Sequence, residues 1–305
     1  MSVIRTTGYE KTNHQRKATV AGMFYEGTET GLNKQLSHCF QQAQTIEKPP
    51  ALKLNQPVQG LIVPHAGLSF SGSVAAIAYQ TLAESGFADA FIVLGPNHQG
   101  LGAPVALYPE GNWETPLGTI PIDAPLVSEL TSDVIEIDDH AHQQRENSIE
   151  VQLPFLQYFN KSFSFAPIAM AQQDYQTATA VGEQIATVIQ HENRRICIIA
   201  STDFSHEGLA YGRMQPKNLD VNAFTKEQDH YAIDAILAHD PKRLVEEIQR
   251  HQISMCGYGP VIAILTATKQ LGAENIFLLH YATSCDVITD AHACVGYGAF
   301  CVTKS

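Results

Sequence analysis

Residues 59–67 of the chain, QGLIVPHAG, contain the pattern that decides the fold. A short apolar run ends abruptly at Pro64, and His65 follows it directly. A run of this length that is stopped by proline and glycine is typical of a buried β-strand. The pattern recurs in residues 90–98, AFIVLGPNH, and in residues 195–206, RICIIASTDFSH. The sequence therefore predicts three buried strands, each followed by polar side chains that can carry chemistry.

Two further apolar runs, residues 275–279 and 293–302, predict a fourth and a fifth strand. Between the strands the apolar residues have helical spacing, at residues 30–45, 71–85, 176–191, 228–238, 241–250 and 260–271. Continuous apolar strands that alternate with helices indicate an α/β fold with a mainly parallel central sheet and helices on both faces. Residues 1–20 are polar, and we expect them to form a loose arm or an edge.

The chain has 305 residues, which is compatible with one large domain or two small ones. No linker rich in proline and serine, internal repeat or low-complexity tract divides it, so we expect a single domain over residues 1–305. Residues 104–140 contain two short runs of β character, residues 104–108 and 118–122. We interpret them as a β-rich excursion within that domain.

The composition of the chain limits which classes of partner and which cellular compartment we expect. A formal net charge of −12 repels phosphate backbones and anionic lipid headgroups, so we expect neither nucleic acid nor a membrane as a partner. The six cysteines form no Cys-x-x-Cys pair, and Cys197, Cys294 and Cys301 lie in apolar runs as buried thiols would. Reduced thiols in a large chain, together with an N-terminus that has no apolar leader, indicate a cytoplasmic protein.

The polar residues that follow the first three strands are His65, His98, Asp203 and His206. In open α/β sheets, ligands bind beyond the carboxyl ends of the strands, so these side chains should meet at one edge. Imidazole is a favoured ligand for iron, copper, nickel and zinc. Two histidines with one more ligand would leave open positions on the ion, and that third ligand could be Asp203 or Cys256.

Each of these residues also has an ordinary structural explanation. A histidine after a strand is commonly a hydrogen-bonded loop residue, and Asp203 could cap a turn. Cys256, in the segment SMCGYGP of residues 254–260, could be a small buried apolar side chain, although the start of a helix would favour its thiolate. His140 and His142 are expected to lie in a solvated loop. No dinucleotide or P-loop motif occurs, so we expect no nucleotide cofactor.

Six segments together resemble the Memo family, the proteins similar to protein B of the AmmeMemoRadiSam system. The segments are VAGMFY (residues 20–25), VPHAG (63–67), LGPNH (94–98), SIEVQLP (148–154), STDFSH (201–206) and CGYGP (256–260). They occur in the order that the family shows, and the resemblance runs almost from end to end of the chain.

The resemblance implies a fold similar to that of class III extradiol ring-cleaving dioxygenases. In those enzymes two histidines and a glutamate hold non-haem ferrous iron, and a further histidine acts as acid and base. By this resemblance His65 and His98 are metal ligands and Cys256 stands where the glutamate stands. His206 is then the catalytic acid/base, with Asp203 beside it.

The resemblance also marks points at which this chain differs from its relatives. Phe24 is expected to form a substrate-binding wall of the pocket, where some family members have tryptophan. Asn147 stands where many relatives have histidine. Cys256 offers a soft thiolate, so copper or zinc competes with Fe(II) as the expected metal. Similar proteins occur with a radical-SAM protein and an AMMECR-like protein, which are therefore the expected partners.

Three functions remain open from the sequence. The favoured one is a metal-binding protein that holds iron or copper, without turnover. The second is a non-haem, metal-dependent oxidoreductase in which His206 moves protons. The third is a module that binds a peptide or partner protein in the same pocket.

Overall fold

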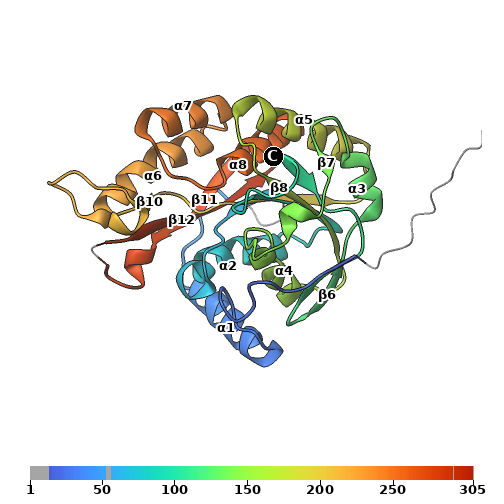
Figure 1. The fold of residues 1–305 in the computed structure, drawn as a ribbon, viewed down its shortest axis with the longest axis horizontal. Coiled ribbons are helices and arrows are strands. Elements are labelled where there is room, and N and C mark those ends of the chain that lie inside the picture. The colour runs from blue at the N-terminus through green and yellow to red at the C-terminus, as the bar shows by residue number, and fades with distance from the viewer. Residues whose placement is uncertain (1–13, 53–55, 291, 305) are drawn as a thin grey trace, which may run out of the picture.

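The structure is a computed structural model, and it describes residues 14–52, 56–290 and 292–304. Within these residues a large mixed sheet has the strand order β10-β12-β2-β9-β3-β8-β4-β7, with β11 paired to β12 (Figure 1). In that order the strands are β10 (His206–Glu207), β12 (Cys294–Thr303), β2 (Val58–Val63), β9 (Ile196–Ser201), β3 (Ala90–Pro96), β8 (Ser164–Met170), β4 (Val105–Leu107) and β7 (Glu136–Ile137), and β11 is Asn275–Thr283.

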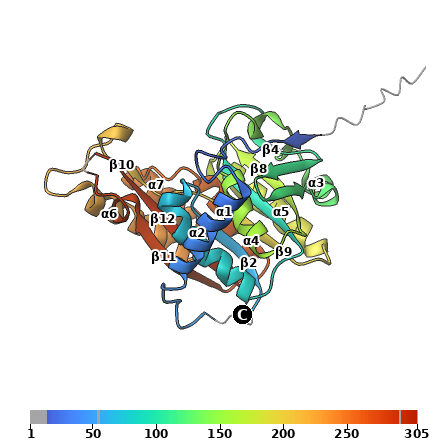
Figure 2. The ribbon, with the colours of Figure 1, turned by 90° about the horizontal axis from the view of Figure 1, so that it is seen from below.

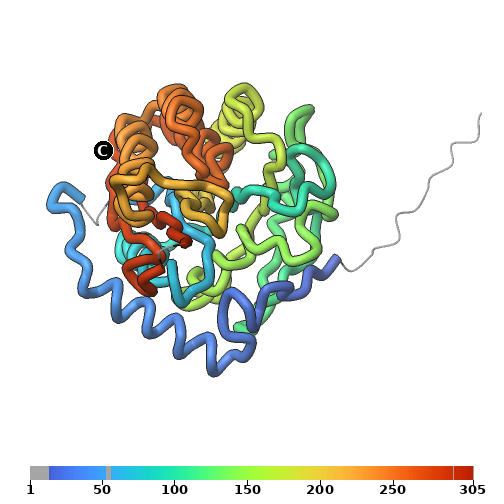
Figure 3. The backbone as a smooth tube through the Cα atoms, turned by 60° about the vertical axis from the view of Figure 1, so that its left-hand side comes forward, coloured from blue at the N-terminus to red at the C-terminus, as the bar shows by residue number. Residues whose placement is uncertain are grey.

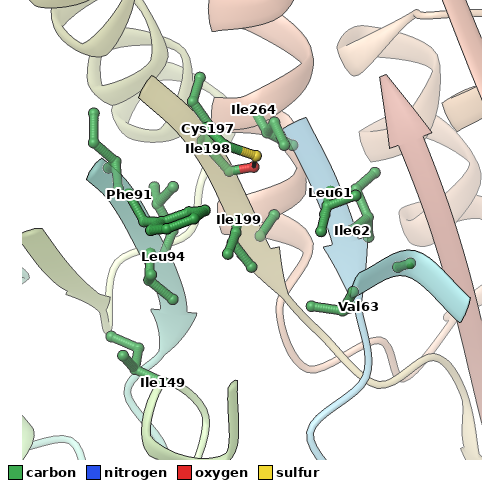
Figure 4. Packing of buried hydrophobic residues seen from close by; sticks show 14 of the residues in the cluster. Leu61, Ile62, Val63, Phe91, Leu94, Ile149, Cys197, Ile198, Ile199 and Ile264 are labelled. Atoms are coloured by element: carbon green, nitrogen blue, oxygen red, sulfur yellow. Dashed lines mark hydrogen bonds between the residues drawn. The ribbon is translucent and has the colours of Figure 1, made fainter. Parts of the chain in front are cut away.

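The centre of the sheet is parallel, as expected. Strands β2, β9, β3 and β8 run side by side in one direction, whereas β12 runs antiparallel to β2 and β4 antiparallel to β8. Figure 4 shows Leu61 on β2, Ile199 on β9 and Phe91 on β3 packed between these strands and the helices. Because the central strands share one direction, the residues that follow β2, β3 and β9 emerge at the same edge of the sheet.

Within the described part of the chain, eight α-helices surround the sheet (Figure 1). One face is covered by α1 (Glu29–Ala43), α2 (Leu68–Glu84) and α4 (Leu153–Phe159), which Figure 2 shows from below. The other is covered by α3 (Ala124–Leu130), α5 (Tyr175–His191), α6 (Val221–Leu237), α7 (Pro241–His251) and α8 (Tyr258–Gln270). Helices α1 and α2 pack closely because Gly72 has no side chain; a Cβ there would lie 2.6 Å from Cys39 Sγ. The expected α/β fold with helices on both faces is confirmed.

Residues 104–140 contain four short strands and the helix α3. Strands β4 and β7 extend the large sheet, and β5 (Asn112–Thr115) and β6 (Gly118–Pro121) form a second sheet with β1 (Gln15–Arg16). Strand β1 is an edge strand of this second sheet, so the described residues of the N-terminal segment form the expected edge rather than a loose arm. Arg16 is only 1% exposed and its guanidinium stacks 4.1 Å from the centre of the Trp113 ring. Residues 1–13 lie outside the described part of the chain.

None of the helices that the structure describes is both long enough and apolar enough to cross a lipid bilayer.

Candidate metal centre

Three loops bring His65, His98 and Cys256 together at the carboxyl edge of the parallel strands. One donor atom from each side chain lies within 4.8 Å of the other two. The Sγ of Cys256 is 3.3 Å from Nε2 of His65, and the two imidazole centroids are 5.2 Å apart. Metal–ligand bonds of about 2.0–2.3 Å place neighbouring donors about 3–4 Å apart. The group therefore has the size of a site for one ion.

The ring of His65 is held in one tautomer by Ser201. The hydroxyl of Ser201 donates its single proton to the Ser148 carbonyl, at 2.6 Å, and accepts from Gln152 Nε2, at 2.8 Å. A hydroxyl has one more lone pair, and Nδ1 of His65 lies 2.9 Å from it. That nitrogen must therefore carry a hydrogen, which leaves the lone pair on Nε2, next to Cys256.

Burial keeps His65 neutral. Its side chain is 2% exposed, and desolvation lowers its pKa to about 4, against an opposing effect of the Asp203 carboxylate. A neutral imidazole is the form that binds metal ions. At neutral pH His65 is thus already in the protonation state and tautomer of a ligand.

His98 obtains its orientation from Glu146, a residue that the sequence analysis did not identify. The Glu146 carboxylate accepts from His98 Nδ1, at 3.0 Å, and from the His98 backbone N–H, at 2.6 Å. Burial opposes the charged forms, but the hydrogen bond and the opposite charge raise the pKa of His98 and lower that of Glu146 to about 2. A carboxylate on one ring nitrogen leaves Nε2 for a metal, a common arrangement around ligand histidines.

Cys256 is a free, half-buried thiol. Its sulfur accepts a hydrogen bond from the backbone N–H of Asp203, at 3.2 Å. Desolvation, followed by the negative charge of Asp203, raises its pKa far above the ordinary value. The thiol therefore keeps its proton at neutral pH until a cation replaces that proton.

Asp203 and His206 lie beside this group but contact different partners from those expected. Oδ1 of Asp203 accepts from the backbone N–H groups of His65, at 2.8 Å, and Ala66, at 3.3 Å. The His206 ring donates from Nδ1 to the Ser254 carbonyl, at 3.2 Å, so this nitrogen is held by Ser254 and not by Asp203. Asp203 fixes the loop that carries His65, and His206 presents Nε2 away from Ser254.

A cavity of about 350 Å³ lies next to the metal-capable group, although none of the three residues of that group lines it. Phe24 lines it, as the resemblance implied, and so do Asp203 and His206. His206 packs edge-to-face on Tyr211, with ring centroids 5.3 Å apart. Asp203 hydrogen-bonds to both His65 and Cys256, and Ala66 follows His65 in the chain, so the cavity lies next to the three metal-capable residues.

Two other positions from the sequence analysis have structural roles. Asn147 is buried, and its side chain donates to the His65 carbonyl, at 3.1 Å. His142 is also buried, with Nε2 at 3.1 Å from the Ala106 carbonyl, so the expectation that it lies in a solvated loop is wrong. His140 is exposed. With Asp138 and Asp139 it forms the second group in the described residues whose donor atoms lie close enough together to hold a metal ion.

Comparison with known proteins places the whole chain in one group. Residues 16–301 match the family model described as Memo-like protein. A MEMO1 family protein of Methanosarcina barkeri is 40% identical over 288 residues, covering 94% of this chain and 99% of that protein. One of Methanopyrus kandleri is 41% identical over 295 residues, covering 93% and 98%.

A solved structure shares the fold at much lower sequence similarity. It is the crystal structure of an uncharacterized protein of Escherichia coli K12, with a TM-score of 0.50 and 14% identity. The match covers 79% of this chain and 99% of that one. At this identity the likeness concerns the fold alone.

Proposed function

This chain belongs to the Memo family, and we propose that it functions by binding one transition-metal ion through His65, His98 and Cys256. The supporting observation is that both imidazoles are oriented before any ion binds. Ser201 and Glu146 each occupy Nδ1, so both Nε2 lone pairs are left for the ion. A histidine that served only packing would not need this arrangement on two neighbouring loops.

The donor set bears on which metal is bound. Copper and zinc both bind well to thiolate and imidazole ligands, and imidazole is also a ligand for iron. We propose copper or iron as the ion, with zinc as the competitor to be tested. A redox-active ion would supply electron transfer or Lewis acidity to a molecule in the adjoining cavity.

A second function, that of a metal-dependent oxidoreductase, is favoured by the position of His206. It lines the cavity, its Nδ1 is hydrogen-bonded to Ser254, and its Nε2 can therefore accept or return a proton of a bound molecule. Pairing with a radical-SAM protein and an AMMECR-like protein remains an expectation from the family resemblance.

The test is an anaerobic titration of the purified protein with Cu(I), Fe(II) and Zn(II), followed by metal analysis after gel filtration. We expect one ion per chain in the wild type and none in His65→Ala, His98→Ala or Cys256→Ser. His206→Ala should retain most of the metal, because His206 lies outside the three-residue group. The surface variant His191→Ala is the matched control.

Two outcomes would contradict the proposal. Wild-type levels of metal in Cys256→Ser and His65→Ala together would show that the ion binds elsewhere. Equal loss in His206→Ala would make His206 a ligand and leave no acid/base for the oxidoreductase alternative. Oxygen consumption by the loaded wild type, absent in His206→Ala, would support that alternative.

A further inference from the structure

The side chains that line the cavity beside the metal-capable group carry negative charge. Its lining includes the carboxylates of Asp203 and Asp290, and within the described residues neither lysine nor arginine lines it. Aromatic rings supply much of the remaining wall, namely Phe24, Phe70, Tyr211 and Tyr297. An acidic, aromatic cavity is suited to a cation with an apolar body.

Asp203 is the more informative of the two carboxylates because it is buried. It is 4% exposed, and Oδ1 is occupied by the backbone N–H groups of His65 and Ala66. The second oxygen, Oδ2, has no hydrogen-bond partner among the described residues, although the side chain lines the cavity. Oδ2 is not among the buried polar atoms that lack a partner, so it is accessible from the cavity, where a ligand that donates a proton to it would form a charge-assisted hydrogen bond.

Asp290 supplies the second charge at the exposed side of the cavity. Its Oδ1 accepts from the backbone N–H of His292, at 2.7 Å, and no side chain of the described residues forms a hydrogen bond or ion pair with its carboxylate. Tyr211 and Tyr297 line the same cavity, and aromatic faces attract cations. Both carboxylates and the rings therefore favour the same sign of charge on a ligand.

A bound metal ion would not reverse this preference. The thiolate of Cys256 and the carboxylate of Glu146 together balance a divalent ion. Asp203 and Asp290 then remain without a compensating charge. The guanidinium of Arg213 is committed to Glu207, the residue after His206, with Nε at 2.9 Å from both carboxylate oxygens.

We propose that the cavity binds a small organic amine in its ammonium form, with an aromatic or apolar body. The ammonium group lies between Asp203 Oδ2 and Asp290, and the body lies against Phe24 and Tyr297. The proposal places this ligand next to the ion of the proposed function, but binding of the amine does not itself require the ion. Anionic molecules of the same shape are excluded by the two carboxylates.

The test compares three probes of one shape by calorimetry, with and without metal: 2-phenylethylamine, 2-phenylethanol and 3-phenylpropanoate. We expect the amine to bind about tenfold more tightly than the alcohol, as a charge-assisted hydrogen bond provides, and the carboxylate not to bind. Asp290→Asn and Asp203→Asn should reduce the preference for the amine. Asp133→Asn removes an equal charge from an exposed position outside the cavity and should not.

Equal binding of all three probes, or tightest binding of the carboxylate, would overturn the proposal. So would an amine preference that survives both substitutions. Metal content is measured in the same samples. If metal-loaded protein shows no preference for the amine, only the proposal of amine binding is contradicted. If the protein binds the amine but takes up no metal, only the proposed metal-binding function is contradicted.

Discussion

Two hydrogen bonds, one to each imidazole, decide which ring nitrogens of the metal-capable group are available. Ser201 fixes His65 and Glu146 fixes His98, both at Nδ1. The two partners differ in charge: a hydroxyl leaves His65 neutral and buried, and a carboxylate makes His98 more basic. The metal-capable group thus combines an imidazole of lowered pKa, an imidazole of raised pKa and a thiol.

Glu146→Gln should weaken metal binding although Glu146 is not a proposed ligand. The amide keeps the size of the side chain but removes the charge that raises the basicity of His98, and one of its atoms becomes a donor facing a donor. Loss of an outer-shell carboxylate typically costs about 10- to 100-fold in metal affinity. Competition titration against a chelator of known affinity measures the change, and Glu183→Gln on the exposed side of α5 is the control. Unchanged affinity would mean that Glu146 serves only the backbone of the loop.

The sequence predicted the residues that meet at the site, but it did not predict the side chains that orient them. His65, His98 and Cys256 follow strands or precede a helix, and that position alone brings them together. Glu146 was missed because nothing in its local pattern differs from an ordinary loop residue. Its carboxylate reaches His98 across 48 positions of the chain, and only the fold shows such a contact.

At the scale of elements, the segment from β1 to Tyr25 is fastened to the molecule by one buried carboxylate. Glu150 accepts from Arg16, at 2.5 Å, from the N–H and hydroxyl of Thr19, from the Val20 N–H and from the Tyr25 hydroxyl. Figure 3 shows the dark-blue N-terminal segment lying beside green parts of the chain. Phe24 is carried by the same segment, so Glu150 also positions one wall of the cavity.

Glu150→Gln should destabilise the protein by about 3–5 kcal/mol, because it leaves the buried Arg16 guanidinium without its counter-charge. Urea unfolding monitored by circular dichroism gives the difference in free energy. The control is Glu114→Gln: Glu114 lies on β5 and pairs at the surface with Lys17 of this segment, and its substitution should cost less than ~1 kcal/mol. Similar losses in both variants would show that the buried pair has no special role.

The elements that the sequence did not predict have recognisable physical causes. Strand β8 was missed because Pro167 interrupts its apolar run, although it pairs with β3 along its whole length. Strand β1 has two residues, and its pairing with β5 is specified by the distant contacts of Arg16 rather than by local pattern. Long apolar runs were predictable, whereas elements formed by long-range polar contacts were not.

At the scale of the whole molecule, one hydrophobic core cluster extends from Val20 to Cys301 and includes both faces of the sheet. That the chain forms a single domain remains a prediction, and this continuous core favours it. Buried ionisable groups within the core couple the stability of the molecule to pH. Among them, His142 lies outside the metal-capable group and can be changed without touching it.

The free energy of unfolding should fall with acidity through His142. Desolvation, followed by the charge of Arg16, lowers the pKa of this histidine to about 3, from 6.5. Below pH 6.5 the unfolded chain therefore binds a proton that the folded protein refuses, so this contribution is present above pH 6.5 and is lost as the pH falls toward 3. The limiting slope is about 1.4 kcal/mol per pH unit for one such group. Asp229, whose pKa burial raises to about 6, acts in the opposite direction, so the total slope alone is not diagnostic.

The decisive quantity is therefore the difference in slope between the wild type and His142→Asn. Urea unfolding of the metal-free proteins at several values from pH 6 to pH 4.5 gives both slopes. The variant has no group to protonate at this position, so its stability should fall less steeply, by up to about 1.4 kcal/mol per pH unit. His140→Asn, two residues away and exposed, should keep the wild-type slope. If His142→Asn also keeps that slope, His142 accepts a proton within the folded protein. Since Nδ1 has no hydrogen-bond partner there, the loop that buries it would then have to open to admit the charge.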